Sequence, residues 1–302
     1  MKRLIESLAL SGLFVTAVPV PASAQTPVDD AARLPGVPFE ELSRRAAEAV
    51  AGGRLDEAMR FYRAGLALNP LWKDGWWRLA LIHFDAGRYA DARAALLELV
   101  RLEPDSGPPW ALLGLSQFKL AAWDDALASL SRAVSLGVPE KEAIGREALH
   151  HLALLLVRAG RLAEASQQLF RLVLLEPDDP ELVMACGLMA LHRRLLPAEV
   201  AAPERGVVAL AGRATYAALG SRDAEARQLF RELVARYPRE RGVHYVAGLY
   251  LSRNASGEGL PLLRQEVELF PDHVEAQLEI AYEILDRGDA REALPFARAA
   301  AR

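Results

Sequence analysis

Six histidines and one cysteine are the side chains of this 302-residue sequence that could most readily bind a metal or act as a base or nucleophile. The histidines are His83, His150, His151, His192, His244 and His273. None lies in an H-E-x-x-H sequence or follows a C-x-x-C pair, the spacings that bring metal ligands together locally. His150 and His151 are adjacent, and on a helix they would project about 100° apart. The spacing therefore predicts no metal site.

Ser116 and Cys186 are the remaining candidates for nucleophilic chemistry. Ser116 lies in GLSQF, which lacks the second glycine of a nucleophile elbow. Cys186 lies in the apolar stretch MACGLMALH, which is typical of a buried thiol that packs as a small hydrophobic side chain. The sequence has no glycine-rich phosphate loop. We therefore expect no catalytic residue and no cofactor.

The charged residues do not form a pattern for nucleic-acid binding. The formal net charge is −4, and lysine and arginine form no sustained run of the kind that meets phosphates. The acidic pairs at residues 124–125 and 178–179 stand where helices are expected to begin. A helix N-terminus favours negative charge, so we interpret these pairs as capping residues.

The first 24 residues have the pattern of a secretory signal peptide. Two basic residues precede an apolar stretch at residues 8–20, and ASA at residues 22–24 is a small-x-small cleavage pattern. The apolar stretch is short for a membrane-spanning helix. We expect cleavage after Ala24, a linker at residues 25–38, and a secreted or periplasmic protein with no stable membrane span after cleavage.

One short phrase recurs four times along the chain. It reads GRLDEA from Gly53, GRYADA from Gly87, GRLAEA from Gly160 and GDAREA from Gly288. Gly53 and Gly87 are 34 residues apart, and the same interval separates Pro70 from Pro104. A fixed period of this length indicates stacked copies of one supersecondary unit.

The unit at residues 73–106 shows how each copy is built. Apolar residues from Trp76 to His83 recur at helical spacing and share one face of a first helix. Gly87 ends that helix, because glycine adopts the left-handed turn conformation without a steric penalty. A second helix carries Ala92, whose small side chain lets the two helices approach closely, and Pro104 closes the unit.

This pattern resembles the tetratricopeptide repeat (TPR), a helix–turn–helix unit of 34 residues. The residues that carry the resemblance in this unit are Trp76, Leu79, Ala80, His83, Ala92, Leu96 and Pro104. Similar units begin near Phe39, Trp110, Arg146 and Val274. The resemblance implies an all-α fold, an α-solenoid of antiparallel helix pairs in a right-handed superhelix.

The repeat pattern is interrupted once. Residues 195–206 contain two prolines where a second helix is expected. We therefore expect an N-terminal array at residues 39–194, an irregular break at 195–206 and a C-terminal array at 207–302. The sequence stops at Arg302 inside an expected second helix, without a polar capping helix. Either the last repeat is the real end or the chain is truncated, and the abrupt stop favours truncation.

In TPR arrays the first helix of each pair lines the concave face, so the resemblance implies a binding groove. The residues predicted to line it are Trp77, Leu81, Phe84, Asp85, Leu115, Phe118, Lys119, Leu154, Arg158, Met184 and Leu188. Most are apolar, and exposed apolar surface often marks an interaction site. The expected ligand is a protein or peptide segment, for example an amphipathic helix. The alternative is that these side chains are buried between neighbouring repeats.

Together these patterns favour a non-catalytic scaffold that mediates protein–protein interaction outside the cytoplasm. TPR domains that clamp an acidic chaperone tail use lysine, asparagine and arginine in the groove. Here Leu81, Leu115 and Leu154 occupy the asparagine positions, which argues against that role. The alternative function is that of a helical accessory region in a larger cell-envelope enzyme, with its catalytic domain beyond Arg302.

Overall fold

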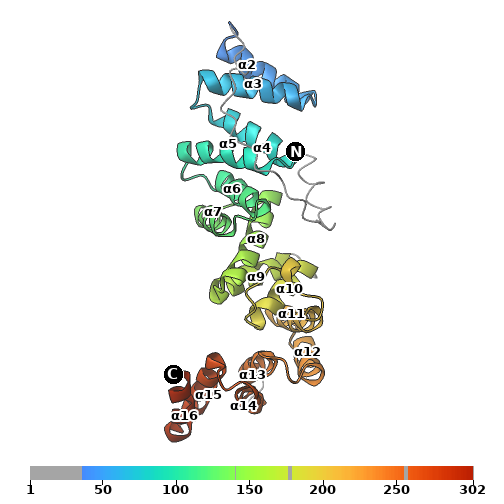
Figure 1. Cartoon of the computed structure of the whole chain (residues 1–302), viewed down its shortest axis with the longest axis vertical. Helices are drawn as coiled ribbons and strands as arrows, with labels where there is room; N and C mark the ends of the chain where they lie inside the picture. The colour runs from blue at the N-terminus through green and yellow to red at the C-terminus, as the bar shows by residue number, and fades with distance from the viewer. Residues whose placement is uncertain (1–35, 140, 176–178, 255–257, 302) are drawn as a thin grey trace. The chain divides into compact units, whose positions relative to one another are not determined.

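The structure is a computed structural model that describes residues 36–139, 141–175, 179–254 and 258–301. Every regular element in these ranges is helical, which confirms the predicted all-α fold (Figure 1). None of the helices in these ranges combines the length and the apolar character needed to cross a membrane. The predicted signal peptide and most of the predicted linker lie outside the described residues.

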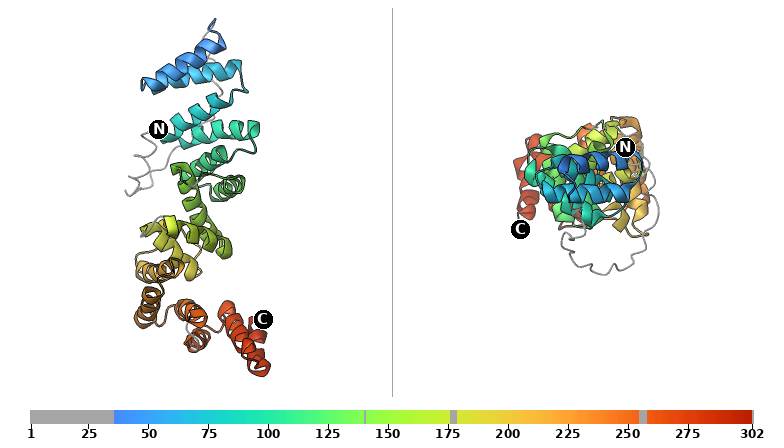
Figure 2. Two further views of the ribbon diagram at one scale, coloured as in Figure 1. Left: turned by 180° about the vertical axis from the view of Figure 1, so that it is seen from behind. Right: turned by 90° about the horizontal axis from the view of Figure 1, so that it is seen from above.

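The chain divides into two compact units at residues 1–151 and 152–302, a boundary that falls within helix α8. In unit 1 the helices pair into hairpins, α2 with α3, α4 with α5 and α6 with α7 (Figure 1; Figure 2). The second helix of one hairpin also packs on the first helix of the next. The helices are α2 (Phe39–Ala51), α3 (Leu55–Leu68), α4 (Lys73–Asp85), α5 (Tyr89–Leu102), α6 (Gly107–Lys119), α7 (Trp123–Leu136) and α8 (Ala143–Ala159).

Unit 2 continues the hairpin arrangement, with α11 packed on α12, α13 on α14 and α15 on α16. It differs from unit 1 at α10, which packs directly on α11. The helices are α9 (Leu162–Leu175), α10 (Pro180–Ala190), the short 3₁₀ helix η2 (Pro197–Glu199), α11 (Arg205–Leu219), α12 (Asp223–Arg236), α13 (Val243–Asn254), α14 (Gly259–Leu269), α15 (Val274–Asp286) and α16 (Ala290–Ala300).

A residue with left-handed backbone conformation closes the turn of the hairpins. The glycines of the recurring phrase have positive φ angles, 70° at Gly53, 71° at Gly87, 74° at Gly160 and 86° at Gly288. At Gly87 the next amide, that of Arg88, donates a hydrogen bond of 2.9 Å to the carbonyl of His83. This is the Schellman hydrogen bond that ends a helix, so the predicted role of the glycines is confirmed.

Three turns hold the same conformation without glycine. The φ angles are 57° at Ala121, 54° at His192 and 56° at Ser221. A side chain in this region crowds its own backbone and costs about 1–2 kcal/mol. The turn geometry is thus kept even where the residue type opposes it.

Small side chains stand where the two helices of a hairpin meet. An alanine follows five residues after each left-handed residue that precedes a second helix, and each of these alanines is at most 1% exposed. They are Ala58, Ala92, Ala126, Ala165, Ala226 and Ala293. The first helix of a hairpin can also have a small residue at this contact. In α6 this residue is Gly114, and a Cβ atom added to it would lie 2.6 Å from Cγ of Leu130 in the partner helix α7. The buried position predicted for Ala92 is confirmed.

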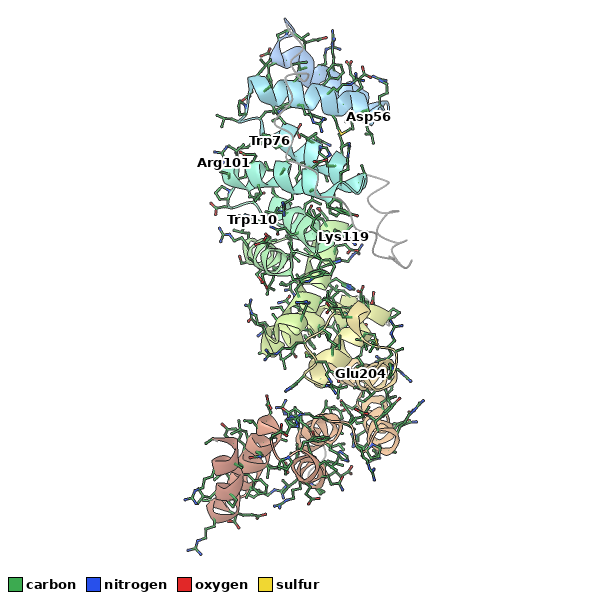
Figure 3. The ribbon with its side chains drawn as sticks, in the orientation of Figure 1. Asp56, Trp76, Arg101, Trp110, Lys119 and Glu204 are labelled. Carbon is green, nitrogen blue, oxygen red and sulfur yellow. The ribbon has the colours of Figure 1, made fainter. Side chains whose placement is uncertain are left out.

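A repeated hydrogen bond fixes the start of several first helices. The indole Nε1 of Trp76 donates to the carbonyl of Pro70 at 2.9 Å, and Trp110 donates to Pro104 at the same distance (Figure 3). In the last hairpin Gln277 holds the equivalent position and donates to the carbonyl of Pro271. The closing proline of one repeat is therefore tied to the first helix of the next.

At the break in the repeat pattern, α10 and α11 cross with their backbones almost in contact. A Cβ atom on Gly187 would lie 2.0 Å from the carbonyl oxygen of Val208, and one on Gly212 would lie 2.0 Å from that of Val183. The segment predicted to be irregular, residues 195–206, connects these two helices. It contains the short helix η2 and the first residues of α11. The close crossing replaces the packing that the missing second helix would provide.

Gly187→Ala and Gly212→Ala should each destabilise the protein, because the added methyl group must displace a backbone carbonyl. Overpacking of this kind costs about 1–3 kcal/mol. Urea unfolding of both variants measures the loss. Arg213→Ala, which truncates an exposed side chain next to Gly212, is the control and should unfold like the parent. Parent-like curves for both glycine variants would contradict the close crossing.

Candidate functional site

The residues predicted to line a groove in unit 1 differ in accessibility. Trp77, Leu81 and Phe118 are half-buried, Asp85 and Lys119 are exposed, and Phe84 and Leu115 are buried at 8% and 4% exposure. The ring of Phe118 also lies edge-on to those of Trp123 and His151, with centroids 5.0 and 4.3 Å apart. Trp77 and Leu81, one turn apart on α4, are therefore an accessible apolar pair among the predicted groove residues of this unit.

In unit 2 the predicted residues are mostly enclosed. Leu154 and Leu188 are buried, at 1% and 0% exposure, while Arg158 and Met184 are half-buried. Arg158 also lies 3.5 Å from a carboxylate oxygen of Glu199. Like Phe84 and Leu115 of unit 1, these two leucines lie in the packed interior of the repeats.

The left-handed residues give a structural register for the first helices. Trp77 and Leu81 stand ten and six residues before Gly87. Counted in the same way from His192, the equivalent positions of α10 are Leu182 and Cys186, two residues before the predicted Met184 and Leu188. The sequence pattern placed these positions two residues too late, because His192 stands where most of the other described turns of this kind have glycine.

The same count from Gly288 reveals an apolar stripe on α15 that the sequence analysis did not name. The equivalents of Trp77, Leu81 and Phe84 are Leu278, Tyr282 and Leu285, which are 39%, 66% and 47% exposed. Their distance from the glycine of GDAREA was the signal that could have found them. We call these three residues the α15 stripe. Its side chains are more exposed than the apolar residues at the equivalent groove positions of α4 and α10.

The other chemically suggestive residues of the sequence have structural roles. Cys186 is fully buried in α10, and burial raises the pKa of its thiol to about 12. Asp179 caps α10, because its carboxylate accepts hydrogen bonds from the amides of Glu181 and Leu182 at 2.8 and 2.9 Å. Both match the sequence interpretation, and Asp178 lies outside the described residues.

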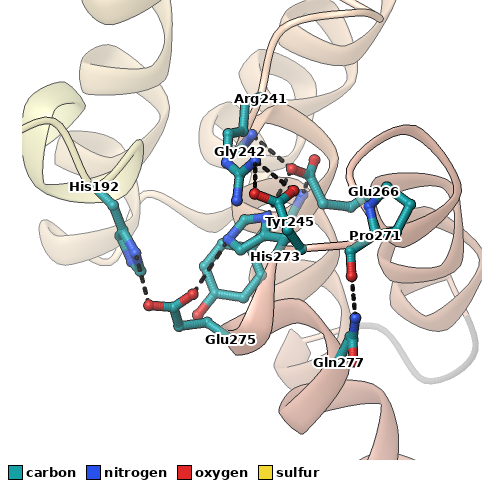
Figure 4. A network of polar contacts seen from close by, with 10 residues as sticks. His192, Arg241, Gly242, Tyr245, Glu266, Pro271, His273, Glu275 and Gln277 are labelled. Carbon is teal, nitrogen blue, oxygen red and sulfur yellow. Dashed lines mark hydrogen bonds and ion pairs between the residues drawn. The ribbon is translucent and has the colours of Figure 1, made fainter. Parts of the chain in front are cut away.

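Unit 2 also contains a cavity of about 360 Å³ whose wall combines polar and charged side chains with a few leucine, alanine and glycine residues. His192, Arg241, Tyr245, His273 and Glu275 contribute to its wall (Figure 4). His192 lies in the turn after α10, Arg241 and Tyr245 lie just before and within the first turn of α13, and His273 and Glu275 lie at the start of α15. The cavity therefore gathers residues that are far apart in the sequence.

Glu266 of α14 organises one side of this region. It is fully buried, its Oε1 lies 2.8 Å from Nδ1 of His273, and it accepts hydrogen bonds from the amides of Gly242 and Tyr245 at 2.7 and 3.2 Å. Burial alone would raise the pKa of Glu266, but these hydrogen bonds outweigh it and hold the pKa below its ordinary value. One carboxylate thus joins α14 to the starts of α13 and α15.

The aromatic and charged groups beside Glu266 complete the cavity wall. The ring of Tyr245 lies 4.8 Å from that of His273 and 5.5 Å from that of His192, between centroids. Burial lowers the pKa of His192, against the opposing effect of Glu275. Arg241 pairs with Asp272 at 2.8 and 3.0 Å from the two carboxylate oxygens.

Comparisons with known sequences assign the repeat. Sequence models of the tetratricopeptide repeat match residues 49–122, 111–180 and 211–239, which together take in more than half of the chain. The chain is built from tetratricopeptide repeats. A curated relative, tetratricopeptide repeat protein 7B from Homo sapiens, is 33% identical over 109 residues, 36% of this chain. The chain spans only 13% of the length of that relative.

Solved structures show weaker likeness. The MamA protein is 18% identical, with 67% of this chain and 92% of that chain covered and a TM-score of 0.45. YrrB, described as a TPR protein with an unusual peptide-binding site, is 18% identical, with 79% and 90% covered and a TM-score of 0.39. At these TM-scores the family assignment rests on the sequence matches and on the helical pattern described above.

Glu266→Gln should destabilise the protein at pH 7 by about 2–3 kcal/mol, because hydrogen bonds to a buried charge are lost without a change of shape. The pKa of Glu266 is depressed in the folded state, so its contribution is present above the ordinary glutamate pKa and is lost as pH falls below it. Urea unfolding at a series of pH values should show parent and variant converging in acid. A constant difference across pH would contradict the role of the charge.

Proposed function

We propose that this TPR chain is a non-catalytic scaffold whose accessible groove positions bind segments of other proteins. The observation that supports this most directly is the exposed apolar stripe of Leu278, Tyr282 and Leu285 on α15. Exposed apolar side chains that share one helix face are typical of interaction sites. Tyrosine adds a large contact area with few rotatable bonds and a hydroxyl group that tolerates water.

The charges of α15 indicate the chemistry of the partner. Its thirteen residues include no lysine or arginine. Of its four acidic residues, Glu275 faces His192 and Glu283 pairs with Arg287, whereas Glu279 and Asp286 add negative charge near the stripe. A segment with apolar anchors flanked by basic residues would match both the apolar stripe and the negative charge of α15. Helix-in-groove recognition uses such anchors at spacings of three and four residues, and charge complementarity sets orientation and association rate. We therefore propose a basic amphipathic segment as the ligand.

A peptide selected against this surface tests the proposal. Selection from a random phage-displayed library on the immobilised mature chain should yield basic, apolar sequences. Tyr282→Ala and Leu278→Ala should weaken binding of the selected peptide about tenfold or more if these residues are hot spots. Leu294→Ala is the matched control, because Leu294 is similarly exposed, at 45%, but stands on the second helix of the same hairpin.

Binding is measured by fluorescence anisotropy, and thermal melts verify that each variant is folded. Equal affinity of the Tyr282, Leu278 and Leu294 variants would place binding elsewhere. Trp77→Ala then tests the equivalent position of unit 1, because Trp77 is half-exposed and does not share the internal ring contacts of Phe118. Failure to select any peptide would contradict the scaffold function itself.

We also propose that the protein acts in the periplasm or outside the cell. The support is the basic, apolar and small-residue sequence at residues 1–24, together with a single cysteine, which makes the fold independent of internal disulfides.

Expression in a bacterial host should yield an exported protein that begins at Gln25, because the ASA pattern ends at Ala24. Intact-mass spectrometry of the periplasmic fraction measures the cleavage. A substitution of Ala24→Leu should block processing and serves as the matched control. An exported chain that still begins at Met1 would contradict the prediction.

A further inference from the structure

We propose that His192, His273 and Glu275 form a binding site for a divalent transition-metal ion, with zinc as the best match. Each residue offers a ligand atom, and the three atoms all lie within 4.8 Å of one another. Two imidazole nitrogens and one carboxylate oxygen are a donor set that zinc uses, with water in the fourth position. The cavity beside these residues provides room for that water.

The spacing of the side chains suits a shared ion better than direct pairing. Nδ1 of His192 lies 3.8 Å from one oxygen of Glu275, and Nε2 of His273 lies 3.7 Å from the other (Figure 4). Both distances exceed that of a hydrogen bond. Donors on one tetrahedral zinc ion stand roughly 3.3–3.5 Å apart, so a small inward movement brings the three atoms to coordination distance. Glu275 is half-exposed and has room to make its share of this movement, and the two imidazole nitrogens must also approach each other from their separation of at most 4.8 Å.

His273 is held in the orientation that a metal ligand requires. Its Nδ1 faces Oε1 of the buried Glu266 at 2.8 Å, so that the ring donates its proton there. The lone pair of a neutral ring is then on Nε2, the nitrogen that faces Glu275. A carboxylate behind a ligating histidine is the usual outer partner of zinc sites. Glu266 thus provides the second layer of the site as well as the cap of α13.

His192 reaches the site from a position where the repeat normally has glycine. Its φ angle of 54° places it in the left-handed turn after α10. Ala121 and Ser221 show that this turn accepts other residues, so the strain alone does not identify a site. What distinguishes His192 is that its side chain projects into the cavity toward Glu275.

The surrounding charges are compatible with a bound cation. Arg241 lines the cavity but is neutralised by its two-oxygen contact with Asp272. The wall also contains Arg193 and Arg194, together with the negative charge of Glu275, and the buried carboxylate of Glu266 lies directly behind His273. A bound ion would connect the end of α10 to the start of α15 within unit 2.

Cobalt provides a direct spectroscopic test on the full chain. After treatment with EDTA and its removal, Co²⁺ should bind at one equivalent and give the intense visible absorption of a tetrahedral site, and Zn²⁺ should abolish it by competition. Zn²⁺ should also raise the melting temperature. His192→Gly and Glu275→Gln should each weaken Co²⁺ binding about tenfold or more. Glu275→Gln changes an exposed side chain and should leave the metal-free melt unchanged.

Ala121→Gly is the matched control for His192→Gly. Both variants place glycine in a left-handed turn, so both should melt at least as high as the parent without metal. Only His192→Gly should lose the tetrahedral absorption and the response to Zn²⁺. No saturable binding by the parent up to about 1 mM Co²⁺, or binding by His192→Gly equal to that of Ala121→Gly, would overturn the proposal.

Discussion

The close approach of the two helices in each hairpin is the constraint on which the rest of the structure depends. Six alanines at one register position are almost completely buried, and the glycine or other left-handed residue five positions earlier turns the chain back sharply enough to bring them there. Because the described turns that follow a first helix and hold a left-handed residue share one Schellman geometry, each position in the preceding first helix has a fixed register relative to its turn. Register alone does not decide accessibility, because, at the position six residues before the left-handed residue, Tyr282 is 66% exposed whereas Leu115 is 4% exposed.

The sequence predicts the hairpins well because their determinants are local. Gly87 and Ala92 are five residues apart and specify a turn and a helix contact without reference to the rest of the chain. Burial is harder to predict, since Leu115 and Trp77 both read as first-helix apolar residues, and only the packing of neighbouring helices decides that Leu115 is enclosed. The cavity of unit 2 could not be predicted at all, because His192 and Glu275 meet only through the stacking of several helices.

Unit 2 shows how a repeat array tolerates the loss of a helix. After α10 the chain does not form a partner helix, and α11 takes that place by a crossing in which Gly187 and Gly212 leave no room for a side chain. The turn after α10 nevertheless keeps the left-handed conformation at His192 and the hydrogen bond from the amide of Arg193 to the carbonyl of Leu188 at 2.8 Å. The end of a first helix is therefore independent of whether a second helix follows, which leaves His192 available for a different role.

Because Cys186 is buried at this crossing, the reactivity of its thiol reports when α10 separates from the helices that pack on it. The chain has one thiol, and it stands in α10 beside Gly187, without solvent exposure and with its pKa raised to about 12. Reaction with a thiol reagent requires the thiolate and access, so it proceeds only from states in which α10 has separated from its neighbours. The rate of labelling of the unmodified protein under native conditions therefore measures the free energy of opening at this one place, separately from unfolding of the other hairpins.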